Sequence, residues 1–343
     1  MALLALVLGM APPVDRASGD RSGTASGTPD PSPSPALLGP LSGLLNGLVG
    51  GLTRGVGGNR PGASGTPTAP GVSGDGPGAP ATPGGGPGGP AKPGRSGTAD
   101  RAASPEVFTG YGFDTCVAPS AEVMRAWLAS PYRAVGVYVG GRGRACPNQP
   151  NLTPEWVSEV DAMGWRLLPL YVGSQAPCVH AQHKRHVTID PSRPGEQGAS
   201  EGRDAVARAR ALGLAEGSPL YLDMEAYDHL DPSCAETTLR FVQAWNREVS
   251  RQGYLPGFYS SADSGVRHMA AARQDGLPDL PEIMWFARWG VPASVDDDPS
   301  LPQDAWRPHR RVHQYAGDVS ESYGGHRLDI DRNRVDAPVA VLR

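Results

Sequence analysis

Residues 220–225 read LYLDME, an apolar run that ends in two carboxylates. Side chains at positions i and i+2 of a strand share a face, so Asp223 and Glu225 point the same way, with Tyr221 below them. Leu222 and Met224 then face the other side, as in a parallel strand that helices cover. We therefore expect a buried strand whose end carries acidic groups.

Similar short runs recur along the chain. Together with the first, the expected strands are residues 112–116, 134–139, 167–172, 220–225, 256–260, 283–287, 311–315 and 327–331. Helical patterns lie between several of them, at residues 121–129, 154–163, 201–212 and 232–252. This alternation predicts an α/β fold, a (β/α)8 TIM-type barrel. We expect the barrel to be irregular, because the last two connections between strands are short. A doubly wound open sheet is the alternative.

The first 104 residues have a different composition. They hold 25 of the 46 Gly and 16 of the 36 Pro, and they contain no Trp, Tyr or Phe. Such a segment cannot bury enough apolar surface to offset its ordering entropy. We expect a signal peptide at residues 1–12, a disordered Gly/Pro/Ser/Thr-rich spacer at 13–104 with a Leu/Gly-rich patch at 37–56, and the barrel at 105–343.

The N-terminus and the charge indicate where the protein acts. Residues 1–10, MALLALVLGM, have the length of a signal-peptide core and are too short to span a bilayer. No Lys or Arg precedes Arg16, which a start upstream of Met1 would explain. The formal net charge is −4 without a basic block, so nucleic acid is not an expected partner. We expect a monomer without a transmembrane span that is secreted or held at the cell envelope.

The four cysteines agree with export, because an even number in a secreted domain indicates disulfides. Cys116, Cys146 and Cys178 each follow one of the first three expected strands, and Cys234 begins the helix after the fourth. All four therefore belong to loops at one face of the barrel. Adjacent strands favour Cys116–Cys146 with Cys178–Cys234, while Cys146–Cys178 with Cys116–Cys234 is also allowed.

Carboxylates gather at the ends of the expected strands, where a barrel of this type carries its chemistry. Asp114 ends the first strand, Asp223 and Glu225 the fourth, and Asp329 and Asp331 the eighth. Carboxyl groups that share a partly dry site push their pKa values apart, which leaves one protonated acid beside one ionised base. That division is what glycoside hydrolysis requires.

Aromatic side chains near the strand ends supply a second signal. Their flat faces suit the C–H faces of sugar rings, although barrel cores also contain many aromatic residues. The candidate sugar-contacting residues, with a neighbouring amide, are Tyr138, Tyr171, Tyr259, Trp285, Trp289, Gln314 and Tyr315, and Asp329 joins them at the rim.

These pieces occur in a familiar order. Asp114 in GFD, the DxE of residues 223–225, FYS at 258–260, the stretch 285–289, Gln314-Tyr315 and the DRN of 331–333 resemble lysozymes of glycoside hydrolase family 25, which act on peptidoglycan. The likeness covers about residues 108–336. The surrounding sequence looks closer still to a secreted bacterial glycoside-hydrolase-like family of unknown function that is related to those lysozymes.

The resemblance implies a role for each carboxylate. Glu225 would be the general acid, and Asp223 the partner that stabilises the positive intermediate or orients the substrate. Asp114 and Asp331 would support them, although the doublet of Asp329 and Asp331 leaves the last assignment open by two residues. The implied activity is a lysozyme-type hydrolase of peptidoglycan or a related N-acetylated polymer. A non-catalytic carbohydrate-binding barrel and a structural cell-envelope protein are the alternatives.

Two other polar segments carry weaker signals. His180, His183 and His186 recur at every third residue, but Lys184 and Arg185 intervene, so we expect a solvated basic loop rather than a metal site. Residues 296–299, DDDP, lack the spaced ligands of a calcium loop. We expect no metal and no cofactor.

Overall fold

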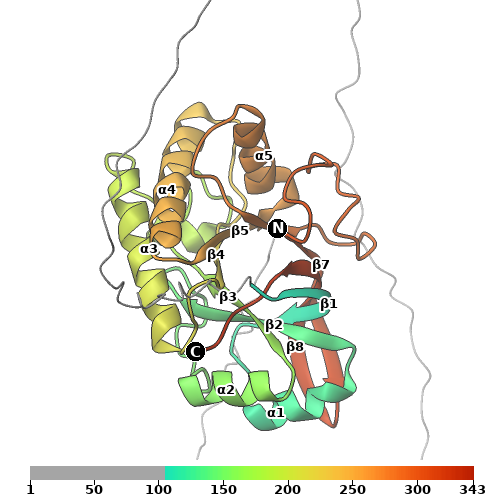
Figure 1. Cartoon of the computed structure of the whole chain (residues 1–343). Helices are drawn as coiled ribbons and strands as arrows, with labels where there is room; N and C mark the ends of the chain where they lie inside the picture. Colours follow the sequence, from blue (N-terminus) through green and yellow to red (C-terminus); the bar gives the residue numbers. More distant parts are fainter. Residues whose placement is uncertain (1–104) are drawn as a thin grey trace, which may run out of the picture. The chain divides into compact units, whose positions relative to one another are not determined.

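In the computed structural model, residues 105–343 are described, and their strands close into a barrel with helices on its outside (Figure 1). The expected signal peptide, spacer and Leu/Gly-rich patch lie outside the described residues. None of the helices within residues 105–343 has the length and apolar character that crossing a membrane requires.

The strands follow one another round the barrel in chain order. They are β1 (Val107–Asp114), β2 (Tyr132–Gly140), β3 (Arg166–Tyr171), β4 (Pro219–Asp223), β5 (Leu255–Ser261), β6 (Ile283–Ala287), β7 (Arg311–Tyr323) and β8 (His326–Pro338). Neighbours from β1 to β7 are parallel. The strand β8 is antiparallel to both β7 and β1.

The last strand corrects the sequence-based expectation of a short strand at 327–331. The strands β7 and β8 form a long hairpin, and its turn contains Gly324 and Gly325 with φ of 57° and 83°. Glycine adopts this left-handed backbone without strain, so the chain reverses at once instead of crossing over through a helix. The first half of β8 therefore lies at the face where the parallel strands end, and Asp331 pairs in register with Asp114.

The helices connect the parallel strands. They are α1 (Ala121–Ala126), α2 (Pro154–Ala162), α3 (Pro194–Ala211), α4 (Pro232–Arg251) and α5 (Arg267–Gln274). Ser120 and Thr153 cap α1 and α2 with their hydroxyl oxygens. The helix α3 begins at Pro194 rather than at residue 201, and α5 has no counterpart among the expected helices.

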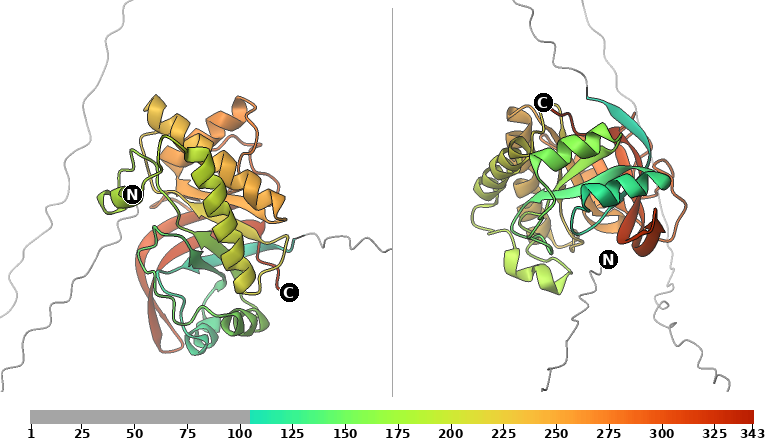
Figure 2. Two further views of the ribbon diagram at one scale, coloured as in Figure 1. Left: turned by 90° about the vertical axis from the view of Figure 1, so that its left-hand side faces the viewer. Right: turned by 90° about the horizontal axis from the view of Figure 1, so that it is seen from below.

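The helices α3 and α4 pack closely along one side of the barrel (Figure 2). Two glycines of α3 allow this approach. A Cβ at Gly198 would lie 2.2 Å from the Phe241 carbonyl oxygen, and one at Gly202 would lie 3.0 Å from that of Trp245. Glycine at both positions therefore lets the two helix backbones come together.

The apolar residues form two clusters, one inside the barrel and one between the barrel and its helices. Trp285 lies in the inner cluster, where its ring packs edge-on against Tyr221 and Tyr259 at centroid distances of 5.2 and 5.7 Å. The outer cluster includes Trp165, Phe241 and Trp245, all completely buried. The barrel interior below the strand ends is thus filled with side chains.

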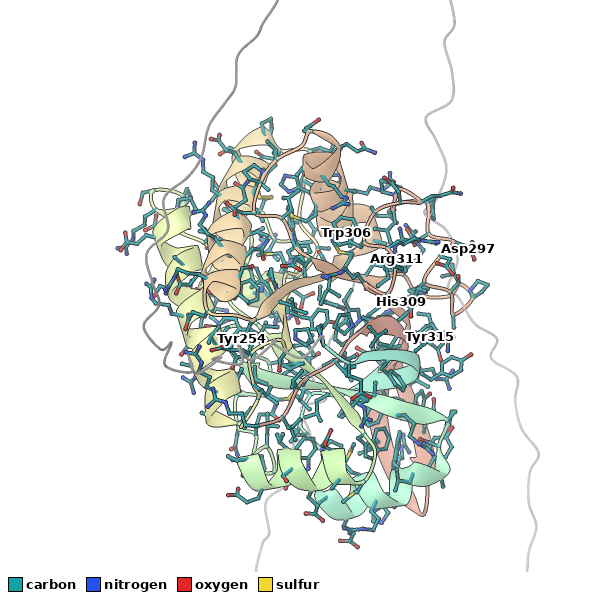
Figure 3. The ribbon with its side chains drawn as sticks, in the orientation of Figure 1. Tyr254, Asp297, Trp306, His309, Arg311 and Tyr315 are labelled. Carbon is teal, nitrogen blue, oxygen red and sulfur yellow. A yellow bond between two sulfur atoms is a disulfide. The ribbon has the colours of Figure 1, made fainter. Side chains whose placement is uncertain are left out.

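Residues 288–310 connect β6 to β7 as a long loop beside the barrel. Arg311, the first residue of β7, is buried beneath it, close to Trp306 (Figure 3). The Arg311 guanidinium donates to the carbonyl oxygens of Val295, Pro302 and Ala305. One side chain thereby fixes three points of this loop to the barrel.

The two ends of the described chain are tied to the barrel at the starts of its strands. Val107 pairs with Pro338, and the Val339 amide donates to the Glu106 carbonyl at 3.0 Å. The Arg343 amide donates to the Gly213 carbonyl at 3.1 Å, shortly before β4 begins, and the C-terminus lies beside the end of α3 (Figure 1).

Candidate active site

A hollow of about 530 Å³ lies at the face where the parallel strands end. We call it the acidic cleft. Among the carboxyl groups that line it are Asp114 from β1, Asp223 at the end of β4, Glu225 just after it, and Asp331 from β8. The β7–β8 hairpin and the loop after β3 supply its walls, through residues such as Asp329 and Lys184.

Asp114 is held by three side-chain donors. Its carboxylate accepts hydrogen bonds from the Tyr138 hydroxyl at 3.0 Å, the Asn333 amide at 2.7 Å and the Gln314 amide at 3.2 Å. Burial raises the pKa of Asp114, and these hydrogen bonds act in the opposite direction. The group is thereby fixed in one orientation on the cleft floor.

Asp331 lies opposite Asp114 and shares a donor with it. The Gln314 amide also reaches Asp331, at 3.3 Å, and the Asp318 backbone amide donates to the same carboxylate at 2.8 Å. Burial, followed by the charge of Asp114, raises the pKa of Asp331 to about 8. The Gln314 side chain therefore bridges two carboxyl groups that come from different strands.

Asp223 and Glu225 leave the end of β4 together. Asp223 is buried, and its Oδ1 atom has no hydrogen-bond partner among the described residues. Burial, followed by the charge of Glu225, raises the pKa of Asp223 to about 8. Glu225 is only partly buried, and Lys184 Nζ lies 3.6 Å from its Oε1 atom.

The backbone around this pair is held by a buried amide. Gln175 Nε2 donates to the Asp223 carbonyl at 2.9 Å, and Gln175 Oε1 accepts from the Glu225 amide at 2.7 Å. One side chain thus satisfies two backbone groups just where β4 ends, which fixes the direction in which both carboxyl groups leave the strand.

Several of the expected sugar-contacting residues line the site. Tyr138 and Tyr259 line the acidic cleft, and Tyr259 also borders a smaller hollow of about 290 Å³, which we call the side pocket. Trp289 lines the side pocket, and Glu225 lines both hollows. Gln314 accepts hydrogen bonds from the Tyr259 hydroxyl at 2.9 Å and the Trp289 indole at 3.0 Å.

Two of the expected sugar-contacting aromatics lie elsewhere. Trp285 is 0 % exposed, and its indole donates to Asn333 inside the barrel at 2.9 Å, so no sugar reaches its ring. Tyr171 faces outward, and its hydroxyl donates to Asp204 of α3 at 2.9 Å. Both placements follow from packing that the strand pattern does not specify.

The remaining candidates lie at the edge. Tyr315 lines neither hollow, and its ring packs edge-on against Tyr111 and His313. Asp329 lines the cleft, but 78 % of its side chain is exposed. Of the Asp329 and Asp331 doublet, Asp331 is therefore the one that reaches the other carboxyl groups.

Sequence reasoning missed three residues that hold the site. Gln175 lies in the loop after β3. Asn333 belongs to the DRN motif of residues 331–333, of which only Asp331 is predicted from the sequence to be a site residue. Lys184 was expected in a solvated loop, and it is instead 5 % exposed. The expectation holds for its neighbours His183, Arg185 and His186, which are exposed.

The cysteines form two disulfides, Cys116–Cys146 and Cys178–Cys234, with Cα–Cα distances of 5.7 and 5.9 Å. This is the pairing that the order of the strands favours. Cys116 and Cys146 line the acidic cleft, and Cys178 lies in the loop that carries Lys184. Within residues 105–343, no group of three or more His, Cys, Asp and Glu side chains is arranged to hold a metal ion.

Comparison with known proteins gives a family and several similar structures. Residues 125–335 match the family model described as "Rv2525c-like, glycoside hydrolase-like domain". The Tat-secreted protein Rv2525c of Mycobacterium tuberculosis is 16 % identical, with a TM-score of 0.46 over 66 % of this chain and 96 % of that one. No curated protein matches the chain.

Two further structures are similar at lower identity. The spore cortex lytic enzyme SleM of Clostridium perfringens is 13 % identical, with a TM-score of 0.42 over 66 % of this chain and 67 % of that one. The modular autolysin LytC of Streptococcus pneumoniae is 13 % identical, with a TM-score of 0.40 over 66 % of this chain and 46 % of that one.

Proposed function

The chain belongs to the Rv2525c-like family of glycoside hydrolase-like domains, and from this membership we propose that it hydrolyses glycosidic bonds by carboxylate acid/base catalysis. The observation that carries the proposal is the convergence of Asp114, Asp223, Glu225 and Asp331 on one cleft. Barrel enzymes place their chemistry at this face, and a strand end that served only the fold would avoid such charges.

The reaction needs one proton donor and one ionised partner. As the bond from the anomeric carbon to the glycosidic oxygen breaks, that oxygen takes a proton from a carboxyl group, and an ionised carboxylate stabilises the positive charge on the sugar. Water then adds to the anomeric carbon and returns a proton to the first group. Asp223 and Glu225 are the pair for these roles, because both line the cleft and their environments differ. Asp114 and Asp331 support them.

The substrate we propose is peptidoglycan or a related N-acetylated polymer. Glu225 and Tyr259 border both the acidic cleft and the side pocket, so a chain of sugars could occupy the two hollows with the scissile bond near Glu225. Trp289 in the side pocket and Tyr138 in the cleft offer aromatic surface to the sugar rings.

We place the protein outside the cytoplasm, as a secreted or envelope-associated protein. The two disulfides support this location, because such bonds persist in oxidising compartments. Both stabilise loops at the cleft face, where the proposed substrate binds.

The test compares the wild type with Glu225→Gln and with Glu236→Gln, a control at an exposed glutamate of α4 outside both hollows. Release of reducing ends is measured from purified peptidoglycan and from an N-acetylglucosamine oligomer. We expect Glu225→Gln to lower turnover by about a hundredfold or more while the circular dichroism spectrum stays unchanged. Glu236→Gln keeps most of the activity. A wild-type protein that releases no reducing ends from either glycan contradicts the proposal.

The structure also supports a second candidate, a barrel that binds a glycan without cleaving it. Three hydrogen bonds already satisfy Asp114, and the raised pKa values of Asp223 and Asp331, about 8 each, favour neutral carboxyl groups that can donate to sugar hydroxyls. Calorimetric binding of the glycan that survives Glu225→Gln, without product from the wild type, selects this candidate.

A further inference from the structure

The strand β7 is irregular between Gln314 and Val319, where its pairing with β8 shifts twice. We call residues 314–318 the β7 bulge. Asp318 has a φ of 55°, in the left-handed region that residues other than glycine seldom adopt. Bulges and such backbone conformations gather beside functional sites, where they redirect side chains and amides. Residues of the β7 bulge contact both the side pocket and the acidic cleft.

On one side, the β7 bulge holds Trp289 of the side pocket. A Cβ at Gly317 would lie 2.0 Å from Cζ2 of Trp289, so the indole ring lies directly on the Gly317 backbone. The indole nitrogen donates to Gln314 Oε1 at 3.0 Å. The backbone that follows Trp289 is tied as well, since the Gly290 amide donates to the Tyr315 carbonyl at 3.1 Å. The bulge therefore fixes the ring that we expect to contact a sugar.

On the other side, the same segment holds the floor of the acidic cleft. Gln314 Nε2 donates to Asp114 Oδ1 at 3.2 Å and to Asp331 Oδ2 at 3.3 Å. The Asp318 amide donates to Asp331 Oδ1 at 2.8 Å. Both carboxylate oxygens of Asp331 thus accept from the β7 bulge, so a movement of the bulge moves this carboxyl group.

Gln314 uses every hydrogen-bonding position of its side-chain amide. The nitrogen gives its two hydrogens to Asp114 and Asp331, and the oxygen accepts from the Tyr259 hydroxyl and the Trp289 indole. The residue is 1 % exposed, so its role is to hold these four groups. Because the amide is planar, its oxygen and its nitrogen move together. A displacement of the Trp289 ring is therefore passed to the cleft floor.

We propose that Gln314 is a positioning residue that couples the side pocket to the acidic cleft, so that a sugar seated against Trp289 fixes Asp114 and Asp331 for the reaction. As a statement about catalysis this rests on the proposed glycan hydrolysis. The substrate is then an oligosaccharide long enough to fill both hollows. Binding of its remote sugar raises kcat and not only the affinity, and a fragment that fills the cleft alone is turned over slowly.

The first experiment observes the coupling without turnover, in the full chain labelled with ¹⁵N. Nuclear magnetic resonance spectra follow the Trp289 indole and the Gln314 side-chain amide, which Trp289→Phe and Gln314→Met assign. The protein carries Glu225→Gln, so that the added N-acetylglucosamine oligomer or soluble peptidoglycan fragment stays intact. We expect the glycan to shift both signals. In Trp289→Phe, which keeps a ring but loses the donor to Gln314, the glycan-dependent shift of the Gln314 amide should fall by about half or more.

Two results overturn the proposal. One is a glycan that shifts the Trp289 signal and leaves the Gln314 signal unchanged. The other is the absence of any shift at Trp289, because the ring is then not a sugar-binding surface.

The second experiment separates kcat from KM. Gln314→Glu keeps an oxygen that accepts from Tyr259 and Trp289, and it puts an oxygen where the amide nitrogen donates to the two aspartates. We expect KM within about threefold of the wild type and kcat lower by about tenfold or more. Gly317→Ala displaces the Trp289 ring, so it should raise KM and lower kcat together. Gln303→Met, at an exposed glutamine of the loop of residues 288–310, is the control and should change neither.

Circular dichroism and the midpoint of thermal unfolding establish that each variant is folded. A residue that only stabilised the fold would lower this midpoint and leave kcat and KM unchanged in the folded variant, so a wild-type kcat in Gln314→Glu contradicts the proposal. If Gln314→Glu does not fold, Gly317→Ala and Trp289→Phe decide the test, because both leave the Gln314 side chain in place.

The spectra separate this proposal from the proposed function. If both signals shift as expected but the wild type cleaves no glycan, the coupling stands and the hydrolase assignment fails. If the wild type cleaves glycan while the Gln314 signal and the kcat of Gln314→Glu show no response, the hydrolase assignment stands and the role of Gln314 fails.

Discussion

Asp114 on β1 and Asp331 on β8 face each other in register across two antiparallel strands, and a single amide, that of Gln314, donates to both carboxylates. This arrangement exists because the β7–β8 hairpin makes β8 antiparallel to β1, so that the first half of β8 lies beside the end of β1. The cleft floor is therefore a hydrogen-bonded assembly of three neighbouring strands, β1, β8 and β7.

Asn333 connects this floor to the barrel interior, and its replacement should be costly. Asn333→Leu removes the 2.7 Å donor to Asp114 and leaves the Trp285 indole without its acceptor. We expect the free energy of unfolding, measured by urea denaturation, to fall by roughly 2 kcal/mol. Arg334→Met is the control on the outer face, where the guanidinium lies 5.0 Å from the Tyr111 ring centroid, and it should cost less. If the two variants lose the same free energy of unfolding, the buried hydrogen bonds of Asn333 contribute no more to stability than the outer contact of Arg334.

Stability should decrease as pH rises, in part because of Asp223. Its pKa is about 8 in the folded protein against an ordinary 3.8, so between about pH 4 and about pH 8 the folded state holds a proton that the unfolded chain releases. Stability from this proton is present at low pH and is lost as pH rises through the folded pKa. The raised pKa of Asp331, also about 8, acts in the same direction.

The measurement is the change in urea midpoint between about pH 4.5 and about pH 8.5. We expect a smaller change for Asp223→Asn than for the wild type, because the variant cannot titrate at this position. Asp329→Asn, at an exposed carboxylate, should keep the wild-type change. If Asp223→Asn and the wild type show the same pH dependence, Asp223 is ionised in the folded protein and the expectation is wrong.

Gly198 should tolerate no side chain, because a Cβ there would lie 2.2 Å from a backbone oxygen of α4. Gly198→Ala must separate the two helices, and we expect a loss of about 1–3 kcal/mol in the free energy of unfolding. Gly195→Ala, in the same helix, is the matched control, since the nearest atom to its Cβ is 4.0 Å away. It should stabilise the protein by up to about 1 kcal/mol through helix propensity. The measurement is the midpoint of thermal unfolding of each variant. A lower midpoint for Gly195→Ala than for Gly198→Ala would contradict the close packing of α3 and α4.

Arg311 should anchor the loop of residues 288–310. Arg311→Met leaves the carbonyl oxygens of Val295, Pro302 and Ala305 without this donor, and we expect a loss of about 2–4 kcal/mol together with faster proteolytic cleavage within the loop. Arg310→Met removes a partly exposed ion pair to Glu282 and should cost about 0–1 kcal/mol. Cleavage at equal rates in the two variants would argue against the anchoring role.

The sequence predicted the barrel well because alternating apolar runs report strands directly. The sequence also predicted the acidic cleft. Carboxylates at the ends of buried strands do not stabilise the fold, so their recurrence there indicates a functional site. The direction of β8 was missed, since a period-two pattern reads the same both ways. Gly324 and Gly325 between two polar-alternating runs were the available sign of a hairpin.

Burial of individual side chains was harder to predict. Trp285 and Trp289 are near neighbours in sequence, yet one fills the barrel and the other lines the side pocket, because depth along a strand depends on the partners across the barrel. Lys184 looks solvated in its local sequence, and its burial comes from Gly143 and Glu225, which are distant along the chain. Contacts of this kind leave no local pattern.

Both ends of the described domain, at Glu106 and Arg343, are hydrogen-bonded at the starts of the strands, whereas the carboxyl groups line their far ends. Residues 105 and 343 therefore both lie on the face opposite the cleft. A domain of residues 105–343 that is coupled to a bead at either of these two residues should keep its cleft open to glycan.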